Sequence, residues 1–319
     1  MVTFISPKSG HKLPNFIKMV YNCEAKYMKI LFIGTNSDYS LAHLKKLHQK
    51  ENIVAIVEAA PRGANEQAER GKWWKSRLAI FAKLHHINYC YTAKLSSTES
   101  ETFIRSTNCD LICIASCSQL IKENIISIPN YGVINSHDSL LPQYRGANPL
   151  YWTFYNWEKV GGNTIHYIDV GEDTGDILLQ RSFDIPFGIS YRKYRKKSMV
   201  NGALMMAEVV VQIKEGTVNP QKQVLTSPLR KGKRCSPEDY QIDWGSWEAR
   251  RAYHFMRGTD YWAIVTPRSY RYYQATGISG KKPLHGHFIA CKDGYVLLSN
   301  RLSFKRSIKG IAKLVLHPR

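Results

Sequence analysis

The side chains best suited to chemistry lie within residues 131–176. A short apolar run leads into Asn135 and His137, and alternate residues of a strand face the same side. About thirty-five residues later, a second strand-like run at 164–168 ends in a turn that carries Asp173. We therefore expect an amide, an imidazole and a carboxylate to converge.

This combination of groups suits acyl transfer to an amine. An asparagine amide offers a neutral N–H donor to a developing oxyanion. A histidine gives or takes a proton at neutral pH, and a neighbouring aspartate orients it or relays a proton through water. An incoming amine is its own nucleophile, so the set needs no serine or cysteine nucleophile.

Repeated strand and helix patterns must position these groups. Apolar runs typical of buried strands alternate with segments of helical spacing from Lys29 onward. This alternation predicts an α/β fold with a doubly wound, mostly parallel sheet, in which ligands bind at the carboxyl ends of strands. Predicted strands cover residues 29–34, 53–57 and 111–115.

Several short motifs surround the candidate residues. They are Asn135-Ser136-His137, Ser139-Leu140-Leu141-Pro142, Tyr144-Arg145-Gly146, Gly162-Asn163-Thr164-Ile165-His166 and Asp173-Thr174-Gly175-Asp176. Together they resemble the folate-dependent formyltransferase family over roughly residues 28–215. Members of that family formylate methionyl-tRNA, nucleotide-linked amino sugars or glycinamide ribonucleotide.

The resemblance implies a mechanism. Asn135, His137 and Asp173 would be catalytic, and the formyl donor would be 10-formyltetrahydrofolate, with no metal. Asn135 and protonated His137 would stabilise the oxyanion, while Asp173 takes the proton shed by the amine and returns it to folate N10. By contrast, His166 is interpreted as a residue of the sheet face.

The resemblance also implies two binding regions. Two loops would enclose the pteridine ring of the folate, and a loop after the first motif would bind the acceptor. The arginine of that loop suits an anionic acceptor or a folate carboxylate, with a structural salt bridge as an equal alternative. The cofactor-binding residues would be Ser118, Gln119, Leu120, Ile121, Val170, Gly171 and Glu172, and the substrate-binding residues Ser139, Arg145 and Gly146.

Composition favours a reduced, cytoplasmic protein. The count of seven cysteines is odd, and the spacing of Cys109, Cys113 and Cys117 fits core residues better than a zinc site. The sequence contains no apolar run near the 18 or so residues that a membrane span needs.

Four segments are expected along the chain. Residues 1–27 form an N-terminal extension with neither a secretory nor a mitochondrial signal, and residues 28–216 the catalytic domain, ending in a helix over 190–215. A linker over 217–236 then leads to a smaller, β-rich C-terminal domain over 237–319.

Charge is concentrated after residue 190. Residues 190–319 hold 25 Lys and Arg against 8 Asp and Glu, a net charge of +17 out of +20 for the whole chain. Such a concentration of positive charge suits a polyanion such as tRNA better than a small nucleotide-sugar.

Trp73 and Trp74, between two lysines, are candidates for base stacking or for simple helix packing.

These observations favour formylation of the α-amine of methionyl-tRNA. A nucleotide-linked amino sugar, as used in surface polysaccharides, is the alternative acceptor, favoured by the divergent C-terminal segment. A basic RNA-binding protein on a non-catalytic scaffold is the alternative of another class. The presence of all three candidate catalytic residues argues against it.

Overall fold

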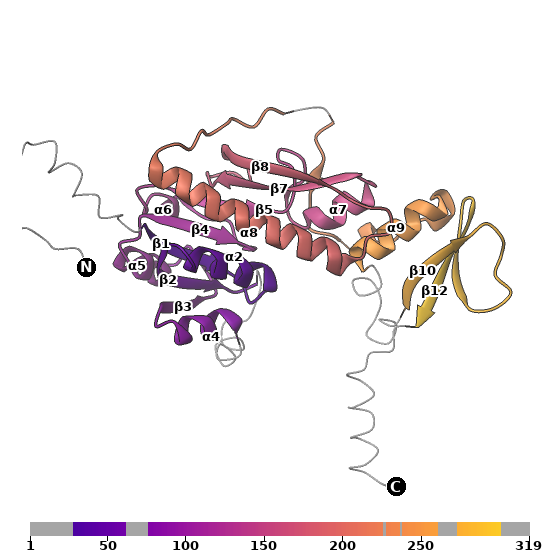
Figure 1. Ribbon diagram of the computed structural model, residues 1–319, viewed down its shortest axis with the longest axis horizontal. Helices are drawn as coiled ribbons and strands as arrows, with labels where there is room; N and C mark the ends of the chain where they lie inside the picture. The colour runs from indigo at the N-terminus through magenta and orange to yellow at the C-terminus, as the bar shows by residue number, and fades with distance from the viewer. Residues whose placement is uncertain (1–27, 62–75, 226–227, 237, 261–272, 301–319) are drawn as a thin grey trace, which may run out of the picture.

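The computed structural model describes residues 28–61, 76–225, 228–236, 238–260 and 273–300 (Figure 1). Its centre is a seven-stranded sheet with the order β3-β2-β1-β4-β5-β7-β8. The strands are β1 (Lys29–Gly34), β2 (Asn52–Ala59), β3 (Asn88–Thr92), β4 (Leu111–Ala115), β5 (Val133–His137), β7 (Val160–Tyr167) and β8 (Ile177–Asp184).

The first five strands are parallel, as predicted. β1 pairs with β2 on one side and with β4 on the other, so the strand order switches at this point. β7 runs antiparallel to both β5 and β8 and extends the sheet beyond β5. The predicted strands at 29–34, 53–57 and 111–115 are confirmed, and the run at 164–168 largely coincides with the end of β7.

Helices cover both faces of the sheet. Alternate residues of β1 enter two separate cores, because successive side chains of a strand face opposite sides: Ile30 and Phe32 join one, Leu31 and Ile33 the other. The helices are α2 (Asp38–His48), α4 (Arg77–Leu84), α5 (Thr98–Ser106), α6 (Glu123–Ile126), α7 (Pro149–Tyr155) and α8 (Tyr191–Glu215).

The long helix α8 lies across the sheet (Figure 1). The Ser190 hydroxyl accepts the Lys193 amide at its start, and Gly216 ends it in the left-handed conformation, with φ 69°. Met205 and Val209 pack into the same core as Phe32. The helix predicted over 190–215 is thus confirmed, and its basic first turns lie beyond this core.

The C-terminal elements add a smaller antiparallel sheet, of order β10-β12-β11. Phe154 of α7, Tyr194 of α8 and Phe255 of α9 share one buried aromatic core with this part of the chain. The predicted β-rich C-terminal part is confirmed, whereas the domain boundaries stay a prediction. Its elements are the short helices Glu238–Tyr240 and Trp244–Ser246, α9 (Ala249–Thr259), β10 (Tyr273–Ser279), β11 (His287–Cys291) and β12 (Gly294–Asn300).

Gly258 permits the close approach of α9 to α7. A Cβ at this position would overlap the ring of Phe154, which is fully buried. Gly258→Ala is expected to lower the free energy of unfolding by about 1–3 kcal/mol, because a full core must shift. Chemical denaturation measures this change. Alanine normally stabilises a helix relative to glycine, so an unchanged or more stable variant would contradict the packing argument.

The segment between α8 and the C-terminal part is docked on the large sheet. Its strand β9 (Lys231–Gly232) pairs in parallel with β6 (Arg145–Gly146), and Arg230 O accepts the Tyr144 amide at 2.6 Å. The linker predicted over 217–236 therefore touches the loop that follows the first motif.

Other properties follow from the described residues. No helix in this part of the chain is long and apolar enough to cross a bilayer. The six cysteines among these residues, from Cys90 to Cys291, all carry free thiols. The expectations for residues 1–27, Trp73 and Trp74 fall outside the described residues.

Candidate active site

The candidate site lies at the carboxyl end of β5, next to the antiparallel strand β7. Asn135 and His137 occupy alternate positions of β5, as expected. The register places Asn135 opposite His166 and His137 opposite Thr164. Residues paired across neighbouring strands lie on the same face, so this register brings a second imidazole to the site.

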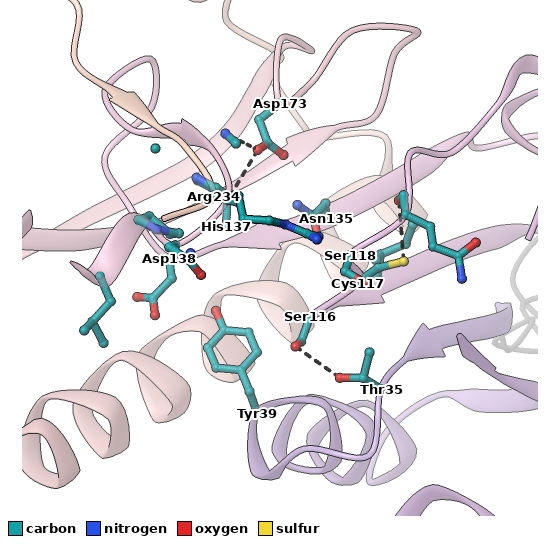
Figure 2. Close-up of a pocket in the computed structure, with 18 of the residues that line it drawn as sticks. Thr35, Tyr39, Ser116, Cys117, Ser118, Asn135, His137, Asp138, Asp173 and Arg234 are labelled. Atoms are coloured by element: carbon teal, nitrogen blue, oxygen red, sulfur yellow. Dashed lines mark hydrogen bonds and ion pairs between the residues drawn. The ribbon is translucent and has the colours of Figure 1, made fainter. Parts of the chain in front are cut away.

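Asp173 reaches the site from the turn after β7 (Figure 2). Its Oδ2 lies 3.5 Å from His137 Nδ1 and accepts the backbone N–H of Gly146 at 2.8 Å. Asp173 has a φ of 53°, in the left-handed region that aspartate tolerates better than most residues. The structure thus brings the three predicted residues Asn135, His137 and Asp173 together.

The other ring nitrogen of His137 has a partner as well. His137 Nε2 donates to the carbonyl oxygen of Tyr144 at 2.9 Å. A carbonyl and a carboxylate are both acceptors, so together they suit a ring that carries a proton on each nitrogen. The expected direct hydrogen bond from His137 to an oxyanion would require the ring to leave one of these partners.

His166 is more than a sheet-face residue. Its Nδ1 donates to Tyr167 O at 2.8 Å, and its Nε2 lies 3.1 Å from Asn135 Nδ2 and 3.5 Å from Asp173 Oδ1. The side chain is fully buried. It therefore contacts two of the three candidate catalytic residues and fixes the Asn135 amide, which keeps a second N–H for another acceptor.

The carboxyl group of Asp173 is held ionised. Burial alone would raise its pKa, but the neighbouring imidazoles of His137 and His166 and the hydrogen bond from the Gly146 amide lower the pKa well below its ordinary value. Asp173 is thus a stable negative charge beside the imidazole of His137.

A cavity of about 1230 Å³ opens over these residues. It is larger than the 300–1,000 Å³ or so of a typical small-molecule pocket, so it has room for two reactants. Apolar side chains form part of its wall, and seven of the predicted binding residues line it. These are Ser118, Gln119, Leu120, Ile121, Gly146, Gly171 and Glu172.

Gln119 contributes by fixing the loop around it. Its side-chain N–H groups donate to Ala60 O at 3.0 Å and to Ala93 O at 3.1 Å, while its side-chain oxygen accepts the Leu95 amide at 3.0 Å. Three strand-end segments are thereby tied together. Because the side-chain amide of Gln119 is hydrogen-bonded to other residues of the protein, the backbone groups of this loop are the ones left to face the cavity.

Three predicted binding residues do not line the cavity. The buried hydroxyl of Ser139 donates to Gln143 O at 2.7 Å. The guanidinium of Arg145 donates to Gln223 Oε1 of the linker, so it forms a structural contact to an amide rather than a salt bridge. Val170 is 76% exposed and does not belong to the cavity wall.

Basic residues that the resemblance did not mark line the cavity. Arg195 comes from the first turns of α8, and Lys233 and Arg234 come from the linker. Asp138, next to His137, faces this part of the cavity and accepts a hydrogen bond from the Ser198 hydroxyl (Figure 2). The charge runs at 192–197 and 230–234 were visible in the sequence, but the first reaches the cavity through the packing of α8 and the second through docking of the linker.

Comparisons with known proteins agree with this geometry. A sequence model of the formyl transferase family matches residues 28–210. The methionyl-tRNA formyltransferase of Citrifermentans bemidjiense is 34% identical over 242 residues, which cover 74% of this chain and 72% of the relative. That of Ruminiclostridium cellulolyticum is 28% identical over 316 residues, covering 89% of this chain and 96% of the relative.

A solved structure shares the fold. The N-formyltransferase of Helicobacter canadensis, in complex with folinic acid and dTDP-3-aminofucose, superposes with a TM-score of 0.59 at 17% identity. The match covers 86% of this chain and 99% of that protein. The similarity extends over both the large sheet and the C-terminal elements of the chain.

Proposed function

Since the chain belongs to the formyl transferase family, we propose that it moves the formyl group of 10-formyltetrahydrofolate to the α-amine of methionyl-tRNA. It is an enzyme of folate-dependent formyl transfer. The observation that carries the proposal is the convergence of Asn135, His137 and Asp173 in one cavity at the carboxyl end of β5.

These residues would act together during transfer. The acceptor nitrogen forms a bond to the formyl carbon, and the free N–H of Asn135 stabilises the oxyanion of the tetrahedral intermediate. The bond from carbon to folate N10 then breaks, and the proton lost by the amine passes to N10 through Asp173 or a water. Asp173 orients the imidazole of His137, whereas the direct hydrogen bond to the oxyanion comes from Asn135.

The shape of the cavity suits a folate. A flat bicyclic ring packs well against apolar side chains, and the backbone groups of two loops can recognise its polar edge. The loop at 116–121 and the turn that carries Asp173 lie on either side of Asn135. The apolar residues that line the cavity include Ile114, Leu120, Ile121 and Ile168.

Two facts support tRNA as the acceptor. The relatives named methionyl-tRNA formyltransferase cover most of this chain at 28–34% identity. In addition, Arg195, Lys233 and Arg234, which belong to the strongly basic part of the chain after residue 190, line the cavity. A polyanion gains affinity from many such contacts, each of which releases counterions.

A nucleotide-linked amino sugar is the second candidate acceptor. The structural similarity to a protein whose complex contains dTDP-3-aminofucose supports it. A small sugar nucleotide would need few of the basic residues outside the cavity. A role as a non-catalytic RNA-binding protein is disfavoured by the intact geometry of Asn135, His137 and Asp173.

The dependence of transfer on salt tests the acceptor. Purified protein is assayed with 10-formyltetrahydrofolate and either methionyl-tRNA or a panel of nucleotide-linked amino sugars. We expect turnover with the tRNA, and a kcat/KM that falls steeply with salt. The slope of log(kcat/KM) against log[salt] is negative for such an acceptor. In the double variant Lys231→Gln, Arg234→Gln, it should become shallower by about one per lost phosphate contact.

A matched control separates a local effect from loss of net charge. Lys45→Gln, Lys50→Gln removes the same charge near the far end of α2 and should leave the slope nearly unchanged. Turnover with a sugar alone, with a shallow slope in all variants, would replace the tRNA proposal by the sugar alternative.

A further inference from the structure

We propose that Gln223, in the linker, is a positioning residue for the His137–Asp173 pair. The inference rests on the proposed function, because it concerns the same pair of side chains. Gln223 lies fifty residues after Asp173 in the sequence and outside the segment matched by the family model. Its side chain nevertheless holds the turn that presents Asp173.

The amide of Gln223 bonds both ends of this turn. Its Nε2 donates to Asp173 O at 2.9 Å and to Gly175 O at 2.7 Å. One side-chain amide group thus satisfies two carbonyls, one from the catalytic residue itself. These bonds fix the orientation of the peptide groups around Asp173.

Arg145 fixes the orientation of Gln223. The Nε and Nη2 atoms of Arg145 donate to Gln223 Oε1 at 2.9 and 2.7 Å. Arginine has only donors and backbone carbonyls only accept, so the reverse orientation of the amide would leave every partner unsatisfied. The hydrogen bonds that run from Arg145 through Gln223 to Asp173 can therefore form in one direction only.

The turn needs such support, because Asp173 has a φ of 53°. A residue other than glycine keeps a positive φ only where the surroundings over-determine it. The Asp173 carboxylate is held by the Gly146 amide, and its carbonyl is held by Gln223. Without the second contact, the peptide after Asp173 is free to rotate and to move the carboxylate away from His137.

The linker also supports the other member of the pair. Arg230 O accepts the Tyr144 amide at 2.6 Å, and Tyr144 O in turn accepts His137 Nε2 at 2.9 Å. Gln223 is partly buried between the exposed residues Lys222 and Val224, which shows that its side chain turns inward. The linker thus contacts the supports of both His137 and Asp173.

This arrangement predicts an effect on the chemical step. Gln223 is not part of the cavity wall, so its loss should leave the KM values for donor and acceptor nearly unchanged. A displaced Asp173 should lower kcat and kcat/KM together, the pattern of an interaction that matters in the transition state. Displacement by about 1 Å can cost on the order of 100-fold in rate.

The test uses two substitutions of Gln223 and two matched controls in the full chain. Gln223→Met removes both the oxygen that accepts from Arg145 and the N–H groups that donate to the turn. Gln223→Glu keeps an acceptor for Arg145 but loses the donors to the turn. Gln221→Met and Gln221→Glu make the same changes two residues away, where the exposed side chain bonds Asn219 O and no other described residue. Transfer is measured with the acceptor that the wild-type protein uses.

We expect kcat to fall roughly 10- to 100-fold in both Gln223 variants and to stay near wild type in both Gln221 variants. A second readout needs no turnover: the Asp173 carboxyl is titrated by NMR with labelled aspartate and assigned with Asp173→Asn. In Gln223→Met the pKa of Asp173 should rise toward its ordinary value, because its contact with His137 weakens. A purely structural role would lower the Tm without moving this pKa.

Two results would overturn the inference. One is a kcat for Gln223→Met equal to that of Gln221→Met, and the other is an unmoved pKa of Asp173. Absence of formyl transfer by the wild-type protein would instead reject the proposed function. The carboxyl titration would still report whether Gln223 holds Asp173 against His137.

Discussion

His137→Ala should lower the kcat of formyl transfer by roughly 10²- to 10⁴-fold, the range attributed to a positioned acid or base. The substitution removes the ring that lies between Tyr144 O and Asp173 Oδ2, and with it the imidazole partner of the carboxylate. Folate binding should persist, because the loop at 116–121 is untouched. Single-turnover kinetics and equilibrium binding of 10-formyltetrahydrofolate measure the two properties separately.

His285→Ala provides a matched control. This histidine is exposed and lies just before β11, a strand of the C-terminal sheet. Its removal should leave kcat unchanged. Turnover of His137→Ala near the wild-type value would refute the role assigned to the pair. Loss of folate binding along with turnover would show instead that the ring supports the cavity wall.

Asp173→Asn should have an effect of similar size, about 10²- to 10⁴-fold on kcat. The change keeps the shape of the side chain but removes the charge that faces His137 at 3.5 Å. The amide can still accept from Gly146, so the turn should keep its conformation. Asp169→Asn is the control in the same turn, because Asp169 is exposed and bonds only neighbouring residues in this turn.

Asp173→Asn should also change how the stability of the protein depends on pH. The folded-state pKa of Asp173 lies well below its unfolded value, which is about 4. Its ionisation therefore adds stability that is fully present above the unfolded pKa and is lost as pH falls toward the folded pKa. The difference in free energy of unfolding between wild type and Asp173→Asn should be constant near neutral pH and shrink below about pH 4. A difference that grows in acid would contradict the ion pair.

The parallel part of the fold was predictable because buried parallel strands carry continuous apolar runs. Residues 29–34 and 111–115 were predicted with the bounds that the structure has. The pairing of β5 with β7 was not predictable in the same way, since it depends on the antiparallel register of two strands separated by a loop and a helix. That register is what places His166 opposite Asn135.

The convergence of Asn135, His137 and Asp173 was predictable because these residues belong to local motifs, but the contacts that support them were not. Tyr144 acts through its backbone carbonyl, which no side-chain pattern reveals. Gln223 acts from an irregular linker, so no periodicity marks its contact with Asp173. Arg145 was selected for its charge, whereas its guanidinium serves the non-local contact with Gln223.

The pairing of β6 with β9 joins residues that are synthesised far apart in time. Residues 145–146 precede residues 231–232 by 86 positions, which a ribosome covers in roughly 4–17 s at about 5–20 residues per second. The first five strands of the large sheet are synthesised before this interval and β7 and β8 within it, so all seven exist while Tyr144 and the Asp173 turn still lack their linker partners. A nascent chain can therefore complete its sheet several seconds before the linker contacts that support His137 and Asp173 form.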